Sequence, residues 1–105
     1  MREIMSRFKD AVTVAPHMHK VLLENDRVRV IEYRGKPGDK AEMHSHPDGI
    51  IYHLEGKAKL RSITPEGQVL EVWVKPGDMM WAPAHAHALE FIGGDECRGL
   101  HIDLK

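Results

Sequence analysis

The stretch Gly38-Asp-Lys-Ala-Glu-Met-His44-Ser-His46-Pro-Asp48 decides the fold of this chain. His44 and His46 stand two positions apart, and in an extended strand such residues point to the same face, roughly 6.5–7 Å apart along the chain. Two imidazoles at this spacing can bind one metal ion. Because two ligands do not make a tight site, a third ligand must come from elsewhere in the fold.

The chain contains two further His-x-His pairs, His17/His19 and His85/His87. The second of these is the expected source of the third ligand, and His87 is our candidate. His85 would share the face of His87 in an extended segment, as a fourth ligand or as a hydrogen-bond donor behind the ligands. No third ligand can be identified near His17 and His19, so we expect no second metal site there.

Short apolar runs, separated by turn residues, follow Pro16. Turn signals at this frequency indicate an all-β sandwich or barrel. We therefore predict an N-terminal segment over residues 1–18, helical or irregular, and one β-barrel over residues 19–105. The runs are Val21–Leu23, Val28–Tyr33, Ile50–Leu54, Ala58–Ile63, Val69–Val74, Met79–Trp81, Ala88–Ile92 and Gly99–Leu104.

A weak internal repeat supports two similar halves. Lys36-Pro-Gly-Asp39 recurs as Lys75-Pro-Gly-Asp78. Proline followed by glycine suits the two central positions of a type II turn, the second of which needs a positive φ. Each copy precedes a His-x-His pair, which suggests two equivalent turns that deliver histidines to a shared interior.

In these motifs the chain resembles the cupins, and in particular small single-domain cupins whose first motif reads HSHPD. Their first motif, G(x)5HxH(x)3–4E(x)6G, is matched by Gly38, His44, His46 and Gly56. Their second motif, G(x)5PxG(x)2H(x)3N, is matched in part, at Gly77, Pro83 and His87, the histidine falling one residue early. The resemblance implies a double-sheet jelly-roll barrel.

One departure from the family pattern concerns the acidic ligand. The position of the usual glutamate holds Gly49, and the adjacent Asp48 would point to the opposite face of a strand unless a bulge turns it. We therefore expect a shell of His44, His46 and His87 without a carboxylate, which leaves coordination positions open. Among cupins, an all-histidine shell is similar to that of thiol dioxygenases and diketone-cleaving dioxygenases.

These features predict a metalloprotein that binds Fe, Mn, Ni, Zn or Cu, between which the sequence does not choose. The expected function is that of a dioxygenase or lyase acting on a small organic acid or carbonyl compound, the ion polarising substrate oxygens or binding O2. The alternative is a non-catalytic module that senses a metal or small ligand. An all-imidazole site should lose its metal as the pH falls through the histidine pKa near 6.5.

Other polar residues are assigned by strand alternation. His53 should face the barrel interior, as a buried histidine or, with His85, as a catalytic acid or base. On the last strand Leu100, Ile102 and Leu104 should face the core, which puts His101 and Asp103 outside. The opposite orientation would place an acid–base pair in the cavity. Three arginines on predicted strands should lie on the solvated outer face: Arg29, Arg34 and Arg61. Alternation leaves open the alternative that one of them points inward and binds a substrate carboxylate.

Composition excludes several partner classes. A net charge of −1, without runs of like charge, gives no reason to expect nucleic acid or an anionic membrane as partner. The single cysteine, Cys97, excludes an intramolecular disulfide. With no apolar run at the N-terminus and none long enough to span a bilayer, we expect a cytoplasmic protein. We also expect a homodimer that covers an exposed sheet edge, with the Ile4/Phe8 face of the N-terminal segment as the contact.

Overall fold

The computed structural model describes residues 7–105. Most of the predicted N-terminal helix, including Ile4, lies outside these residues. The described part contains helix α2 (Ala11–Val14), where Asp10 occupies the N-cap and its carboxylate accepts a hydrogen bond from Thr13 N at 3.1 Å. Helix α2 lies beside strand β3 (Lys40–His46), which carries the central histidine pair.

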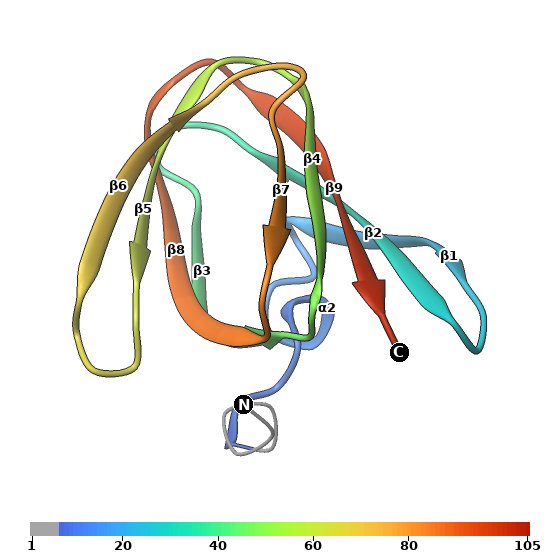
Figure 1. Ribbon diagram of the computed structural model, residues 1–105. Coiled ribbons are helices and arrows are strands. Elements are labelled where there is room, and N and C mark those ends of the chain that lie inside the picture. Colours follow the sequence, from blue (N-terminus) through green and yellow to red (C-terminus); the bar gives the residue numbers. More distant parts are fainter. Residues whose placement is uncertain (1–6) are drawn as a thin grey trace.

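Two antiparallel sheets face each other in the described chain and form the predicted all-β jelly roll (Figure 1). One sheet has the order β1-β2-β9-β4-β7 and the other the order β3-β8-β5-β6. Besides β3, the strands are β1 (His19–Glu24), β2 (Val28–Gly35), β4 (Gly49–Glu55), β5 (Ala58–Ile63), β6 (Val69–Val74), β7 (Met79–Ala82), β8 (His85–Gly94) and β9 (Cys97–Leu104).

Each apolar run identified in the sequence lies within a strand of the structure. The predicted hairpin at Asn25 joins β1 to β2, and the Asn25 side chain accepts hydrogen bonds from the backbone N–H groups of Arg27 and Val28. The His44–His46 segment is extended, as the metal-site argument requires.

The two Lys-Pro-Gly-Asp copies form the same turn. Gly38 and Gly77 have φ values of 99° and 93°. In each copy the aspartate N–H donates to the lysine carbonyl, while the aspartate carboxylate accepts from the lysine N–H at 3.0 Å. The first turn leads into β3 and the second into β7, so the repeat starts each of the two segments that deliver histidines.

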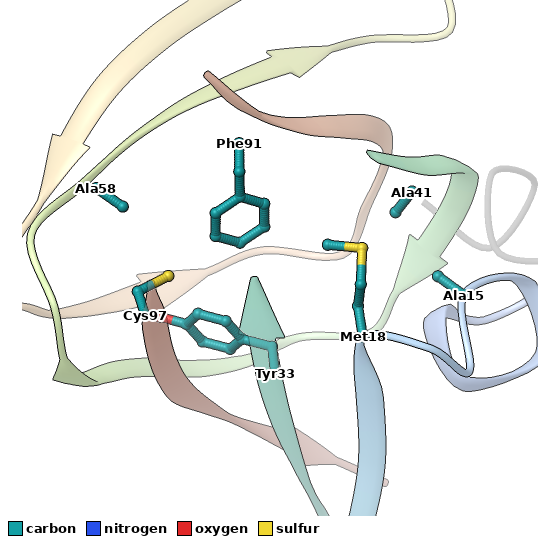
Figure 2. Packing of buried hydrophobic residues seen from close by; sticks show 7 residues of the cluster. All are labelled: Ala15, Met18, Tyr33, Ala41, Ala58, Phe91 and Cys97. Atoms are coloured by element: carbon teal, nitrogen blue, oxygen red, sulfur yellow. The ribbon is translucent and has the colours of Figure 1, made fainter. Parts of the chain in front are cut away.

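The apolar core is small and lies at one end of the space between the sheets. Its two rings, Tyr33 and Phe91, lie close to Met18 and the buried Cys97 (Figure 2). Several aliphatic side chains pack against this cluster without being fully buried: Ile51, Leu60, Val74 and Leu89. These four side chains also line a cavity, so they contact the apolar core on one side and the cavity on the other.

Candidate metal centre

The pairing of β3 with β8 brings the histidines together. In this antiparallel ladder His44 lies opposite His87, and His46 lies opposite His85. One ring nitrogen from each of His44, His46 and His87 lies within 4.8 Å of the other two. The three side chains predicted from the sequence as ligands therefore converge, from two neighbouring strands of one sheet.

The hydrogen bond of His44 fixes which of its ring nitrogens is free. His44 Nδ1 lies 2.6 Å from the carbonyl oxygen of Glu42, which can only accept, so Nδ1 carries the proton and Nε2 carries a lone pair. His87 Nδ1 lies 2.7 Å from Ser62 Oγ. The Nε2 atoms of His44, His46 and His87 are buried and have no hydrogen-bond partner among the described residues. Three buried nitrogens without hydrogen-bond partners, grouped at one place, are typical of a cation-binding site and unusual in an apolar core.

Burial keeps these imidazoles neutral. Desolvation lowers the pKa of His44 to about 4 and that of His87 to about 2, and it holds the pKa of His46 well below its usual value. Metal ions bind the unprotonated ring, so the site is ready for a cation at neutral pH. Because these pKa values are lowered, we expect the site to lose its metal at a pH well below the 6.5 of an ordinary histidine.

The site has no carboxylate from its own motif. Asp48 is exposed, and its Oδ1 accepts a hydrogen bond from Ala84 N at 2.7 Å, so it ties the β3–β4 turn to the β7–β8 turn. A Cβ atom at Gly49 would lie 2.5 Å from the backbone oxygen of Ile102, so no side chain fits at the position of the usual glutamate. The donor set is three neutral imidazoles, which fits a divalent first-row ion.

The three nitrogens lie at a cavity of about 460 Å³ between the two sheets. No charged side chain is found in its lining, as far as the chain is described. Leu70, Met80 and Trp81 line it while remaining more than half exposed, so they form its mouth between edge strands β6 and β7. The rest of the lining is aliphatic or aromatic apart from Ser62, Tyr33 and six histidines: His19, His44, His46, His85, His87 and His101.

His85 lines the cavity beside the ligands. Its ring stacks on His46 at 5.1 Å, and its Nδ1–H donates to the carbonyl of Pro83 at 2.8 Å, which leaves Nε2 with a lone pair. Its nitrogens fall outside the 4.8 Å group of the other three. His85 therefore lines the cavity but is not part of the group formed by the three candidate ligands.

His53 is interior, as predicted, but it does not line the cavity. Its Nε2–H donates to Gly56 O at 2.6 Å, and its Nδ1 accepts from the Tyr33 hydroxyl at 2.5 Å. With both nitrogens engaged, His53 cannot exchange a proton with a ligand directly, so the expectation that it is a catalytic acid or base is not supported. Its contact with the cavity is through Tyr33, whose ring belongs to the apolar core and also lines the cavity.

The prediction for the last strand was wrong. His101 lines the cavity, and its ring stacks on His46 at 4.4 Å with an interplanar angle of 8°. Asp103 is buried, and burial raises the pKa of its carboxyl to about 6. The two side chains point inward because this part of the interior holds the histidine cluster, with His101 lining the cavity and Asp103 beside His46. This inward orientation is the alternative that residue alternation left open for β9.

The His17/His19 pair divides. His17 is exposed and donates from Nε2 to the Lys40 carbonyl at 3.1 Å. His19 is buried, lines the cavity and donates from Nδ1 to Ala15 O at 3.0 Å, with its ring 5.7 Å from that of His44. The sequence had not assigned His19 to the site. Arg34 and Arg61 make their ion pairs outside the cavity, as expected, and Arg29 is part-buried against Asp10.

None of the helices in residues 7–105 is long and apolar enough to cross a membrane.

Comparison with known proteins identifies neighbours by structure. No protein-family model matches the chain, and no curated protein matches it. A cupin domain from Bordetella pertussis superposes with a TM-score of 0.72 at 24% identity, over 84% of this chain and 92% of that one. A cupin superfamily protein from Desulfitobacterium hafniense gives 0.60 at 25% identity, over 83% and 75%. The polyketide cyclase RemF from Streptomyces resistomycificus gives 0.62 at 25% identity, over 95% and 75%.

Proposed function

This chain belongs to the cupin superfamily by its fold, and from that premise we propose that it is a metal-dependent enzyme for apolar carbonyl compounds. The observation that carries the proposal is the juxtaposition of three unpartnered imidazole nitrogens with an uncharged cavity. A ligand that fits this space is largely apolar and carries an oxygen function at the end that meets the histidines.

The lining favours a carbonyl compound over a small organic acid. A carboxylate held away from the metal needs a cationic side chain such as arginine, and the described part of the cavity wall offers none. The cavity volume of about 460 Å³ is in the range that holds drug-sized ligands, larger than a small acid requires. One solved neighbour acts as a polyketide cyclase, and its likeness to this chain supports a carbonyl-bearing substrate.

The roles follow from the positions. His44, His46 and His87 would hold a divalent ion, which supplies Lewis-acid polarisation of a substrate oxygen when bound. Leu60, Leu89 and the other aliphatic walls bind the apolar body of the substrate and exclude water from the reacting end. His85 accepts a proton at Nε2 from a carbon or hydroxyl of the bound substrate, so a dioxygenase or a lyase reaction can begin with the same proton transfer.

The test loads metal-free protein separately with Fe²⁺, Mn²⁺, Ni²⁺, Zn²⁺ and Cu²⁺. Each form is given a panel of apolar 1,3-diketones, aromatic ketones and phenols, with oxalate as the charged control. We expect turnover of an apolar carbonyl compound by at least one metal form and none by the metal-free protein. Oxygen uptake with turnover identifies a dioxygenase, and turnover without it identifies a lyase.

The matched variants are His85→Ala and His17→Ala. Loss of a general base costs roughly 10²–10⁴-fold in kcat, so the first variant should fall by that factor while the second, exposed and outside the cavity, keeps the wild-type rate. Tight metal and ketone binding without turnover in any form would reject the enzyme and favour the alternative, a ligand-sensing module. Preference for oxalate over the ketones would contradict the proposed substrate class.

A further inference from the structure

Asp103 occupies the place that the missing glutamate leaves. In the β4–β9 ladder Gly49 lies directly opposite Asp103, so the two residues share a face of the sheet. A side chain at Gly49 would collide with the backbone of β9, 2.5 Å from Ile102 O. The close approach of the two strands thus removes a carboxylate from β4, while Asp103 on β9 brings one to the same region.

The carboxylate of Asp103 faces the histidine cluster. One of its oxygens lies within 4.8 Å of a ring nitrogen of His46 and of one of His101. Asp103 is 6% exposed, and its carboxyl experiences burial and the charges of Arg29 and Asp10, with no hydrogen bond contributing among residues 7–105. Beside it on the same face, across the β2–β9 ladder, lies Arg29, whose guanidinium pairs with Asp10 at 2.5 Å. A buried carboxylate without a partner is costly and calls for an explanation.

A second metal ion held by His46, His101 and Asp103 is not the explanation that the geometry favours. The rings of His46 and His101 are stacked, with 8° between their planes and 4.4 Å between their centres. The lone pair of an imidazole nitrogen lies in the plane of its ring, so the lone pairs of parallel stacked rings do not converge. Two imidazoles need convergent lone pairs to bind one ion at about 2.0–2.1 Å.

The three ligand histidines differ in what supports them. His44 has the Glu42 carbonyl at Nδ1, and His87 has the Ser62 hydroxyl at Nδ1. His46 has no such partner at Nδ1 within the described chain. Its Nε2, like that of the other two ligands, is free. Metal-ligating histidines almost always donate their second N–H to a carboxylate, a carbonyl or water, which fixes the ring and raises its basicity.

We propose that Asp103 is the positioning residue of His46: its carboxylate accepts the Nδ1–H of His46 when an ion is bound at Nε2, while His101 holds the ring by stacking. The inference rests on the proposed metal site. In this arrangement the carboxylate near the metal comes from β9 and supports the ligand His46. In the family pattern the carboxylate comes from the position of Gly49 on β4 and is itself a ligand.

The test measures Zn²⁺ affinity by competition with a chromophoric chelator, and ¹H–¹⁵N spectra of the His46 ring in the Zn²⁺-loaded protein. The wild type should show a proton on His46 Nδ1 that exchanges slowly with water. Asp103→Ala should weaken Zn²⁺ binding roughly 10–100-fold and speed the exchange of that proton. Asp103→Asn, whose amide oxygen still accepts a hydrogen bond, should recover part of both. Asp39→Asn, on a surface turn, is the control and should change neither.

The outcomes separate the two proposals. If the wild type binds no Zn²⁺, the proposed metal function fails and the role of Asp103 fails with it. If the wild type binds Zn²⁺ and folded Asp103→Ala binds it equally well, only the role of Asp103 is overturned. Far-ultraviolet circular dichroism of the metal-free variants identifies those that are folded, and Asp103→Asn keeps the test valid should the alanine variant not fold.

Discussion

The hydroxyl of Ser62 on β5 lies 2.7 Å from Nδ1 of His87 on the neighbouring strand β8. This contact orients the ring whose Nε2 is free in the cluster. We predict that Ser62→Ala weakens divalent-metal binding roughly 10–100-fold, the usual effect of losing a partner behind a metal ligand. Ser62→Thr keeps the hydroxyl and should bind metal like the wild type. Equal affinities of the alanine variant and the wild type, by titration calorimetry, would contradict this role.

The buried histidines make the metal-free protein sensitive to acid. Their pKa is lowered in the folded state, to about 4 for His44 and about 3 for His101, so below pH 6.5 the unfolded chain binds protons that the folded chain does not. The contribution of these histidines to the free energy of unfolding is therefore fully present above pH 6.5. Below that pH it falls by about 1.4 kcal/mol per pH unit for each such histidine, until the lowered pKa of the folded state is reached. Asp103 offsets part of this between pH 6 and 4, because its pKa is raised.

Urea unfolding of the metal-free protein at pH 7.5, 6.5, 5.5 and 4.5 measures the effect. Since a domain of this kind has roughly 5–15 kcal/mol of stability in total, we expect a steep fall in the unfolding free energy below pH 6.5. The variant His101→Leu should show a shallower fall, and His17→Gln should match the wild type. An unfolding free energy that stays constant from pH 7.5 to 4.5 would refute the burial of neutral imidazoles.

The closeness of β4 and β9 at Gly49 can be tested by adding one methyl group. Gly49→Ala places Cβ 2.5 Å from Ile102 O, so the strands must separate, at a cost of roughly 1–3 kcal/mol. At Gly93, by contrast, a Cβ would meet Lys59 Cβ at 3.7 Å, an ordinary contact, so Gly93→Ala is the matched control and should be nearly neutral. Thermal unfolding compares the two, and equal melting temperatures would mean that β4 and β9 are farther apart than described.

The buried pair of Tyr33 and His53 should contribute to stability rather than to chemistry. In Tyr33→Phe the Nδ1 of His53 loses its donor inside the protein, which costs about 1–3 kcal/mol. Tyr52→Phe, at a part-buried tyrosine on β4, should stay within about 0.5 kcal/mol of the wild type. Chemical denaturation gives both values. A Tyr33→Phe protein as stable as the wild type would show that the hydrogen bond is absent in solution.

The fold was predictable because its signals are local. Alternating short runs, polar turns and the two Lys-Pro-Gly-Asp copies each specify an element without reference to the rest of the chain. The grouping of the candidate ligands was predictable for a similar reason: His-x-His on a strand fixes a common face, and the later His-x-His pair supplied His87. The pairing of His44 with His87 across the two strands was not predicted. The packing of Gly49 against β9 depends on the distance between two strands, which no spacing in the sequence encodes.

The inward orientation of β9 was missed because alternation does not say which face is inside. On this strand Leu100 and Ile102 point away from the cavity, while His101 and Asp103 point into it or lie beside it. The rule that aliphatic residues face the interior fails where the interior is a binding site with its own polar groups. The position of His19 in the cavity lining was also missed. Its ring is held by a hydrogen bond to the Ala15 carbonyl, which precedes the barrel, and no sequence motif indicates that contact.

The central claim is that His44, His46 and His87 bind one divalent ion, and metal stoichiometry tests it most directly. Metal-free protein is titrated with Co²⁺, and bound metal is measured by visible absorption and by elemental analysis after dialysis. We predict one ion per chain in the wild type and in His17→Ala, and almost none in His44→Ala, His46→Ala or His87→Ala at the same free Co²⁺ concentration. Unchanged stoichiometry in these three variants, or no bound ion in the wild type, would contradict the account.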